Sequence, residues 1–188
     1  LVNEEQAMIW RGPMASQALE QLIHQTRWEG LDYLIVDMPP GTGDIQLTMA
    51  QKVPLTGAVI VTTPQDIALL DAKKGITMFQ KVNVPVLGLI ENMAVHVCSQ
   101  CGHQEHIFGQ EGGKRLAQQL GMDYLGALPL ALSIRTQADA GRPSVVAEPE
   151  GEIAQLYRQM ARTLAAKVAQ QGTNLAPKFP TITISKRS

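Results

Sequence analysis

The stretch LDYLIVDMPPGTGD, at residues 31–44, decides how the rest of the chain is interpreted. Its first six residues are mostly apolar and rich in residues that favour strands, and they are followed by an aspartate, two prolines and a Gly-x-Gly turn. A new apolar pattern then begins at Ile45. This order predicts a buried strand at 31–36, a functional loop and a helix of about two turns over residues 45–50.

Asp37 is predicted to stand at the carboxyl end of this strand, where open α/β sheets place their ligands. The glycines behind it, Gly41 and Gly43, leave backbone N–H groups free to approach an anion. A carboxylate in that position is suited to hold a hydrated metal ion beside a phosphate. The plain alternatives are a turn with a solvated Asp37, and an Asp44 that only caps the next helix.

Three further apolar runs alternate with helical patterns along the chain. The runs predict buried strands at residues 57–63, 84–90 and 122–128, and the patterns between and around them predict amphipathic helices. Such alternation predicts an α/β fold, with a parallel β-sheet and helices on both faces. The segment GQEGGK at 109–114 suggests a phosphate loop only superficially, because its spacing is wrong, and it is predicted to open a helix.

Four polar or special residues fall at the predicted carboxyl ends of strands: Asp37, Thr63, Asn92 and Pro129. Parallel strands bring these ends to one crevice, and such crevices commonly hold a nucleotide. Asn92 offers both a donor and an acceptor, as recognition of a purine edge requires. An asparagine at a strand end is also typical of an ordinary turn.

Cys98 and Cys101 form a second chemical centre. Their spacing lets both sulfurs reach one metal ion or cluster from a tight turn. His103 and His106 extend the pattern to C-x-x-C-x-H-x-x-H, so a compact zinc site and a dithiol redox centre are alternatives. The two histidines are also explained as surface polar residues. A [4Fe–4S] cluster usually takes four thiolates, and a two-fold axis would bring a second cysteine pair to the same point.

The composition of the 188 residues indicates a single domain of ordinary size. A formal net charge of −1 and an aromatic content of 4% argue against binding to nucleic acid or to an acidic membrane. No apolar run approaches the roughly 18 residues of a membrane span, and no signal peptide is evident. We therefore expect a cytoplasmic protein whose domain covers residues 1–170, followed by a flexible tail at 171–188.

Several motifs, in order, resemble the Mrp/ApbC family. They are WRGPM at 10–14, LDYLIVDMPPGTGD at 31–44 with IQLTMAQ after it, TTPQDIALLDAKKG at 62–75, ENM at 91–93, and the cysteine pair. Members of that family are ATP-dependent iron–sulfur cluster carriers in the MinD/ParA branch of P-loop NTPases. The likeness runs from about residue 1 to residue 170. The Gly-rich phosphate loop with its lysine, which the family carries near the start of its domain, is not among these 188 residues, so we expect an N-terminally truncated domain.

The resemblance implies a role for each predicted site residue. Asp37 would orient Mg²⁺ through water, Gly41 would sense the terminal phosphate of ATP, and Asp44 closes the same nucleotide-sensing loop. Asn92 would read the base. Pro129 and Arg135 belong to a segment that resembles the loop closing over adenine, although Arg135 could equally be a surface residue that begins a helix.

The resemblance also implies partners and a cargo. A homodimer would hold a [4Fe–4S] cluster between the Cys98 and Cys101 pairs of its two subunits and transfer it to apo iron–sulfur proteins. Full-length members of the family are ATPases, but without the phosphate loop this chain is expected to bind nucleotide weakly or not at all. It is also expected to leave an apolar sheet edge exposed and to associate through it. Two other functions remain open: a ParA/MinD-type positioning ATPase, and a zinc-stabilised domain with a degenerate nucleotide site.

Overall fold

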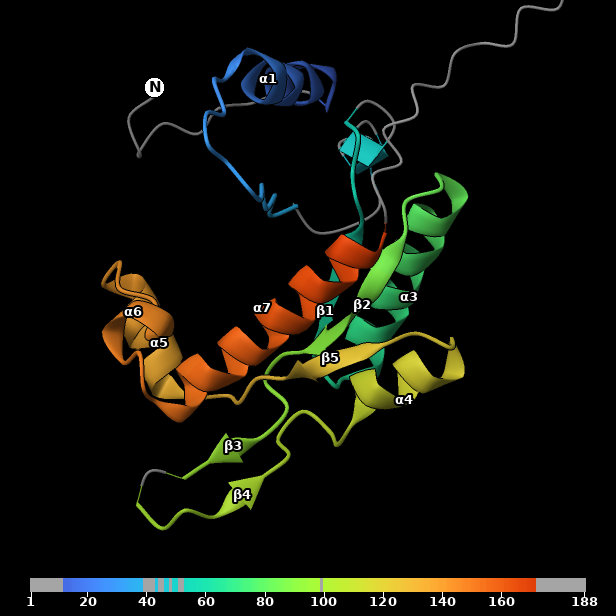
Figure 1. Ribbon diagram of the computed structural model, residues 1–188. Coiled ribbons are helices and arrows are strands. Elements are labelled where there is room, and N and C mark those ends of the chain that lie inside the picture. Colours follow the sequence, from blue (N-terminus) through green and yellow to red (C-terminus); the bar gives the residue numbers. More distant parts are fainter. Residues whose placement is uncertain are drawn as a thin grey trace, which may run out of the picture.

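A parallel three-stranded sheet forms the centre of the computed structural model, which describes residues 12–38, 43, 46–47, 49–50, 53–98 and 100–171 (Figure 1). The strand order is β1-β2-β5, with β1 at Ala58–Thr62, β2 at Val86–Glu91 and β5 at Tyr124–Ala127. These strands coincide with three of the predicted apolar runs. The predicted α/β fold with a parallel sheet is therefore confirmed.

Helices α3 (Asp66–Lys81) and α4 (Gly112–Gln119) cover one face of the sheet. Buried residues recur every three or four positions along α3, at Ala72, Ile76 and Phe79, so one stripe of the helix meets the strands. The main core lies between this stripe and the sheet. Its buried members are Ala50, Ile60, Ala72, Ile76, Met78, Phe79, Val84, Leu89, Leu116 and Ala117.

Helix α7 (Glu152–Gln170) covers the opposite face and packs on β5 and β2. The contact is close at Gly126, where an added Cβ would lie 3.0 Å from Cγ of Met160. Helices therefore cover both faces, as predicted. Two short helices, α5 (Leu132–Asp139) and α6 (Ser144–Ala147), connect β5 to α7. In the described part of the chain, no helix is both long enough and apolar enough to cross a membrane.

The predicted strand at residues 31–36 is wrong. This segment follows helix α1 (Gly12–Gln25), runs without regular secondary structure, and pairs with none of the described strands. Its apolar side chains are exposed, and Ile35 is 85% exposed. A strand exists only where a neighbouring strand takes its backbone N–H and C=O groups, and none of the described strands lies next to this segment.

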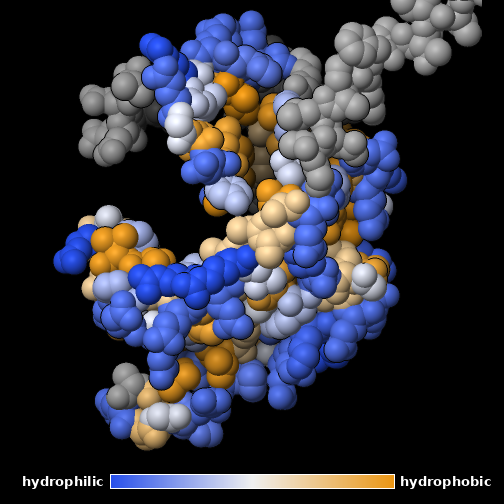
Figure 2. Space-filling model, viewed as in Figure 1, coloured by the Kyte–Doolittle hydropathy of each residue, from blue (hydrophilic) through white to orange (hydrophobic). Residues whose placement is uncertain are grey.

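Strand β1 is an edge strand, because among the described residues it pairs only with β2. On its α3 side Ile60 is buried, but on the other side Val61 is 60% exposed. Figure 2 shows further hydrophobic side chains, in orange, beside a hollow at the N-terminal part of the molecule. The apolar edge expected from the sequence is therefore present.

Part of the predicted 45–50 helix and all of the tail beyond residue 171 lie outside the described residues. Residues 46–47 and 49–50 have helical backbone, and the side chain of Met49 is buried. Gly41 and Asp44, two predicted nucleotide-site residues, also lie outside the described part of the chain.

Candidate functional site

The carboxyl ends of the three strands meet at one edge of the sheet. Thr63 directly follows β1, Asn92 directly follows β2, and Pro129 stands two residues beyond β5. The backbone N–H of Asn92 donates to the carbonyl of Thr62 over 2.7 Å, so the first two ends are joined. Three of the four predicted strand-end residues thus lie along the same edge.

Asn92 is involved in a strained turn. Its side-chain oxygen accepts a hydrogen bond of 2.9 Å from the N–H of Met93, whose φ of 57° lies in the left-handed region. A long side chain seldom adopts that backbone conformation, and such residues cluster at functional sites. Met93 uses one of the two lone pairs of the Asn92 oxygen, so a ligand could meet the amide nitrogen and the second lone pair.

The remaining predicted nucleotide residues are placed differently. Asp37 lies in the exposed, unpaired segment, so no strand carries it to the edge formed by β1, β2 and β5. Arg135 is in the first half of α5, where its guanidinium forms an exposed ion pair of 3.2 Å with Asp139. This pair agrees with the alternative of a surface helix residue.

A small hairpin extends from the carboxyl edge of the sheet (Figure 1). Its strands are β3 (His96–Val97) and β4 (Gln104–Glu105), which pair antiparallel. Cys98 directly follows β3, and its N–H donates to the carbonyl of His103 over 2.9 Å. The N–H of Gly102 donates back to the carbonyl of Cys98 over 2.9 Å, with a φ of +70° that favours glycine. This tight loop sets both cysteines at the tip.

The two cysteines are suited to bind a metal ion or cluster. Both are free thiols; Cys98 is half-buried and Cys101 is exposed. Hydrogen bonds from the backbone N–H groups of Gln100 and Cys101, and from the thiol of Cys101, lower the pKa of Cys98. A lowered pKa favours the thiolate, which is the metal-binding form of cysteine. One chain thus offers two sulfur ligands; within the residues that the structure describes, no three or more His, Cys, Asp or Glu side chains converge on a metal position.

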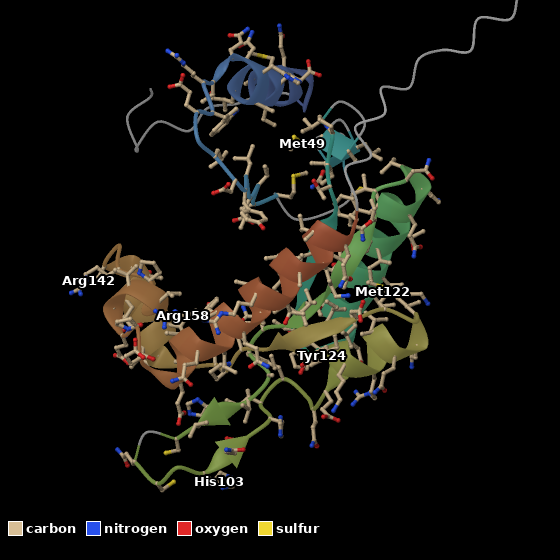
Figure 3. The ribbon with its side chains drawn as sticks, viewed as in Figure 1. Met49, His103, Met122, Tyr124, Arg142 and Arg158 are labelled. Carbon is tan, nitrogen blue, oxygen red and sulfur yellow. The ribbon has the colours of Figure 1, made fainter. Side chains whose placement is uncertain are left out.

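The histidines near the cysteines fall into two groups. His106 and His96 stand at the root of the hairpin, where Nδ1 of His106 donates to the carbonyl of Ala94 over 2.9 Å and Nδ1 of His96 to that of Leu130 over 3.1 Å. His103 is exposed at the end of the hairpin away from the sheet (Figure 3). His106 therefore serves the root of the hairpin, and of the two histidines in the C-x-x-C-x-H-x-x-H string only His103 belongs to the tip.

One residue at this edge has no role in the sequence analysis. Glu91, the last residue of β2, is only 2% exposed, and its carboxylate accepts a hydrogen bond from the N–H of Gly113 at the start of α4. Nearby, burial raises the pKa of Tyr124 to about 12, and the charges of Glu91 and Glu111 act in the same direction. The detectable pattern is an acid that ends an apolar strand, followed some twenty residues later by two adjacent glycines.

Comparison with known proteins agrees with this arrangement. The family described as "ParA: NUBPL iron-transfer P-loop NTPase" matches residues 1–165. A protein of Pseudomonas fragi named "Iron-sulfur cluster carrier protein" is 62% identical over 163 residues, which cover 87% of this chain and 57% of that protein. The chain spans about half the length of the curated relatives it matches.

Solved structures show the same fold. A nucleotide-binding protein from Archaeoglobus fulgidus in complex with ADP is 35% identical, with a TM-score of 0.63 over 73% of this chain and 55% of that one. The cell division ATPase MinD of Pyrococcus furiosus has a TM-score of 0.60 over 83% of this chain and 59% of its own, at 20% identity. At that identity the second likeness concerns the fold alone.

Proposed function

Since the chain belongs to the ParA family of NUBPL-type iron-transfer P-loop NTPases, we propose that it is the part of an iron–sulfur cluster carrier that holds the cluster. The observation that carries the proposal is the β3–β4 hairpin. It places two free cysteines, one with a lowered thiol pKa, on a loop that extends from the carboxyl edge of the sheet. A reducing cytoplasm is the compartment we propose, because it keeps such thiols available for iron.

The cargo we propose is a [4Fe–4S] cluster shared by two copies of the chain. Cys98 and Cys101 give two thiolates, whereas such a cluster usually takes four. A homodimer supplies the other two when the tips of two hairpins meet on a two-fold axis. The exposure of Cys101 supports this arrangement, because a second chain can reach the tip without rearrangement of the sheet.

Transfer to an apo iron–sulfur protein would proceed by ligand exchange. Cysteine sulfurs of the recipient replace Cys98 and Cys101 on the irons one at a time, and the protons that the recipient's thiols lose as they bind iron are available to the released sulfurs. No electron is gained or lost in this exchange. An exposed tip suits this chemistry because the recipient must approach the cluster directly, and the lowered pKa of Cys98 keeps its sulfur ready to accept the next cluster.

We infer a nucleotide role for the carboxyl edge of the sheet from Asn92 and Pro129, which lie along it, and from the ADP bound by the Archaeoglobus fulgidus protein. We keep Asp37, Gly41 and Asp44 as proposed partners of Mg²⁺ and the ATP phosphates, which for Asp37 requires residues 31–36 to pair beside β1. Arg135 is kept as a proposed neighbour of the base, which requires its ion pair with Asp139 to open. These 188 residues lack the phosphate loop, so the residues present do not complete an ATP site and no hydrolytic step is derived for them.

Calorimetry with Mg-ATP tests the nucleotide part. We expect the 188-residue chain to show no saturable binding, or binding no tighter than about millimolar, since the backbone nest and lysine that hold the phosphates are absent. Micromolar binding by these residues would contradict this view of the site.

Anaerobic reconstitution with iron and sulfide tests the proposed cargo. Iron, sulfide, zinc and oligomer mass are measured for the wild type, for Cys98→Ala and for Gln104→Ala, an exposed hairpin position that leaves both cysteines in place. We expect about four irons and four sulfides per dimer in the wild type and in Gln104→Ala, and loss of both in Cys98→Ala. One zinc per chain without sulfide would instead identify a structural zinc site and overturn the carrier proposal.

A further inference from the structure

Glu91 is a buried acid that the proposed chemistry does not use. It is the last residue of the central strand, where it pairs with Thr62 of β1 and Ala127 of β5. Its carbonyl also accepts a 2.8 Å hydrogen bond from the N–H of Leu128. The main chain at Glu91 is therefore fixed from both sides. In the described part of the chain no lysine or arginine forms an ion pair with its carboxylate.

The carboxylate is stabilised by the amino end of α4. It accepts a hydrogen bond from the N–H of Gly113, and the helix dipole favours a negative charge at that end. The approach is so close that only glycine fits. A Cβ on Gly113 would lie 2.8 Å from Cδ2 of Leu89 and 3.0 Å from Oε2 of Glu91, and a Cβ on Gly112 would lie 2.5 Å from the carbonyl oxygen of Pro64.

The bond joins the two roots of the segment that carries the cysteines. Two residues after Glu91, Met93 turns the chain out of the sheet with a φ of 57°, and two residues before Gly113, Glu111 turns it into α4 with a φ of 52°. Both are non-glycine residues in the left-handed region, which requires support from their surroundings. The hairpin lies between these two turns, so its direction depends on how firmly the roots are held together.

We propose that Glu91 is the positioning residue of the cluster hairpin: its carboxyl group, bound to the N–H of Gly113, holds the roots of residues 94–110 together and so sets where Cys98 and Cys101 stand relative to the sheet. The inference rests on the proposed cluster-carrier function for its purpose. The hairpin can be followed without any cluster, so the two can fail separately.

Hydrogen exchange on the iron-free protein tests the proposal directly. Glu91→Gln keeps the shape and an acceptor oxygen but removes the carboxylate. Gly113→Ala places a Cβ 3.0 Å from Oε2 of Glu91 and 2.8 Å from Cδ2 of Leu89, so its effect on the core is followed through α7. Glu111→Gln is the matched control, since it removes a charge from the same helix end, where the carboxylate pairs with Lys114 at 2.6 Å rather than with the N–H of Gly113, and it leaves the backbone turn in place. Gly75→Ala is the control for a glycine substitution, because its nearest neighbour would be Cδ1 of Ile60 at 3.8 Å.

We expect residues 94–110 to exchange about fivefold to tenfold faster in Glu91→Gln and Gly113→Ala, the difference between a charge-assisted and a neutral hydrogen bond, while α7 exchanges as in the wild type. Both controls should match the wild type in the hairpin. If Glu91→Gln fails to fold, Gly113→Ala decides by the same comparison. Wild-type exchange at 94–110 in the folded variants, or an equal acceleration in α7, would overturn the positioning role and leave only general stability.

Cluster retention gives the second readout. After reconstitution, the two variants are expected to lose iron to a chelator several-fold faster than Glu111→Gln, at equal protein stability. Equal retention in Glu91→Gln, Gly113→Ala and Glu111→Gln would overturn the positioning role. A wild type that takes up no iron–sulfur cluster would instead overturn the proposed function, and the exchange experiment would then still decide whether Glu91 holds the hairpin.

Discussion

Strand β1 and the segment at residues 31–36 have similar sequences and different structures. The first reads AVIVT and the second LDYLIV, and both are short, apolar and rich in residues that favour strands. β1 pairs along its length with β2 and is covered by α3, whereas the segment at 31–36 has neither a paired strand nor a covering helix among the described residues. Apolar, β-branched composition favours a strand, but a strand forms only where a neighbouring strand takes its backbone hydrogen bonds.

The largest difference should appear when one apolar side chain is shortened to alanine in the sheet and one in the unpaired segment at residues 31–36. Leu89→Ala in β2 removes a side chain with 0% exposure and should lower the free energy of unfolding by about 2–5 kcal/mol. Ile35→Ala should change it by no more than about 0.5 kcal/mol, because that side chain is 85% exposed. Urea denaturation measures both. A loss above about 1 kcal/mol in Ile35→Ala would mean that the segment is packed in solution.

A smaller effect is expected at the open edge of the sheet. Val61→Lys places a charge on the exposed face of β1 and should weaken self-association of the iron-free chain about tenfold, since burial of one such side chain contributes roughly 1.5–3 kcal/mol. Gln80→Lys adds the same charge at an exposed position of α3 and is the control. Sedimentation velocity over a range of concentrations gives the association constants. Equal constants for the two variants would show that this edge is not the contact.

Alkaline pH should affect the packed part through Tyr124. Its pKa is raised to about 12 in the folded chain, chiefly by burial, so folding holds its proton where the unfolded chain releases it. The contribution is fully present below about pH 10 and is lost as the pH rises towards 12. Between pH 9 and pH 11 the urea midpoint of unfolding should fall less in Tyr124→Phe than in the wild type. Tyr33→Phe removes a hydroxyl from the unpaired segment and should behave as the wild type. An identical fall in all three proteins would contradict this.

The smallest difference concerns one ion pair in each region. Lys167 of α7 pairs with Asp123 just before β5, and its side chain is 24% exposed, so Lys167→Met should lower the free energy of unfolding by up to about 1 kcal/mol. Arg27 pairs with Glu29 at 2.5 Å, with both side chains largely exposed, and Arg27→Met should have no measurable effect. Thermal denaturation at low and high salt distinguishes the two. A larger loss of unfolding free energy in Arg27→Met than in Lys167→Met would contradict the view that α7 is packed and the segment after α1 is not.

Most of the paired part of the fold follows from apolar periodicity. The runs predicted at 57–63, 84–90 and 122–128 contain β1, β2 and β5, and the helical patterns predicted between and around them include α3 and α7. Periodicity could not show whether residues 31–36 form a strand, because it describes a single segment, whereas a strand also requires a second segment to pair with. Periodicity does not predict hairpin β3–β4, since two strands of two residues carry almost no pattern.

The candidate site was predictable where it depends on strand ends. The carboxyl ends of parallel strands lie at one edge of the sheet, so the topology alone places Thr63, Asn92 and Pro129 along that edge. Asp37 was expected there too and depended on the strand that does not form. For Glu91 the sequence offers only a weak pattern, an acid at the end of an apolar strand with two adjacent glycines some twenty residues later, and the contact with Gly113 that gives the acid its role exists only in the folded chain.

The closed root of the hairpin has an evolutionary consequence. The hydrogen bond between Glu91 and Gly113 closes the intervening chain into a loop with fixed ends. The tip of the hairpin therefore has little influence on how the sheet folds. Lengthening such a loop raises the entropic cost of closing it only slowly, by about 0.6 kcal/mol for each doubling of the loop length. Selection could therefore exchange the residues between 98 and 103 for tips of other lengths and other ligands while the scaffold below stayed the same.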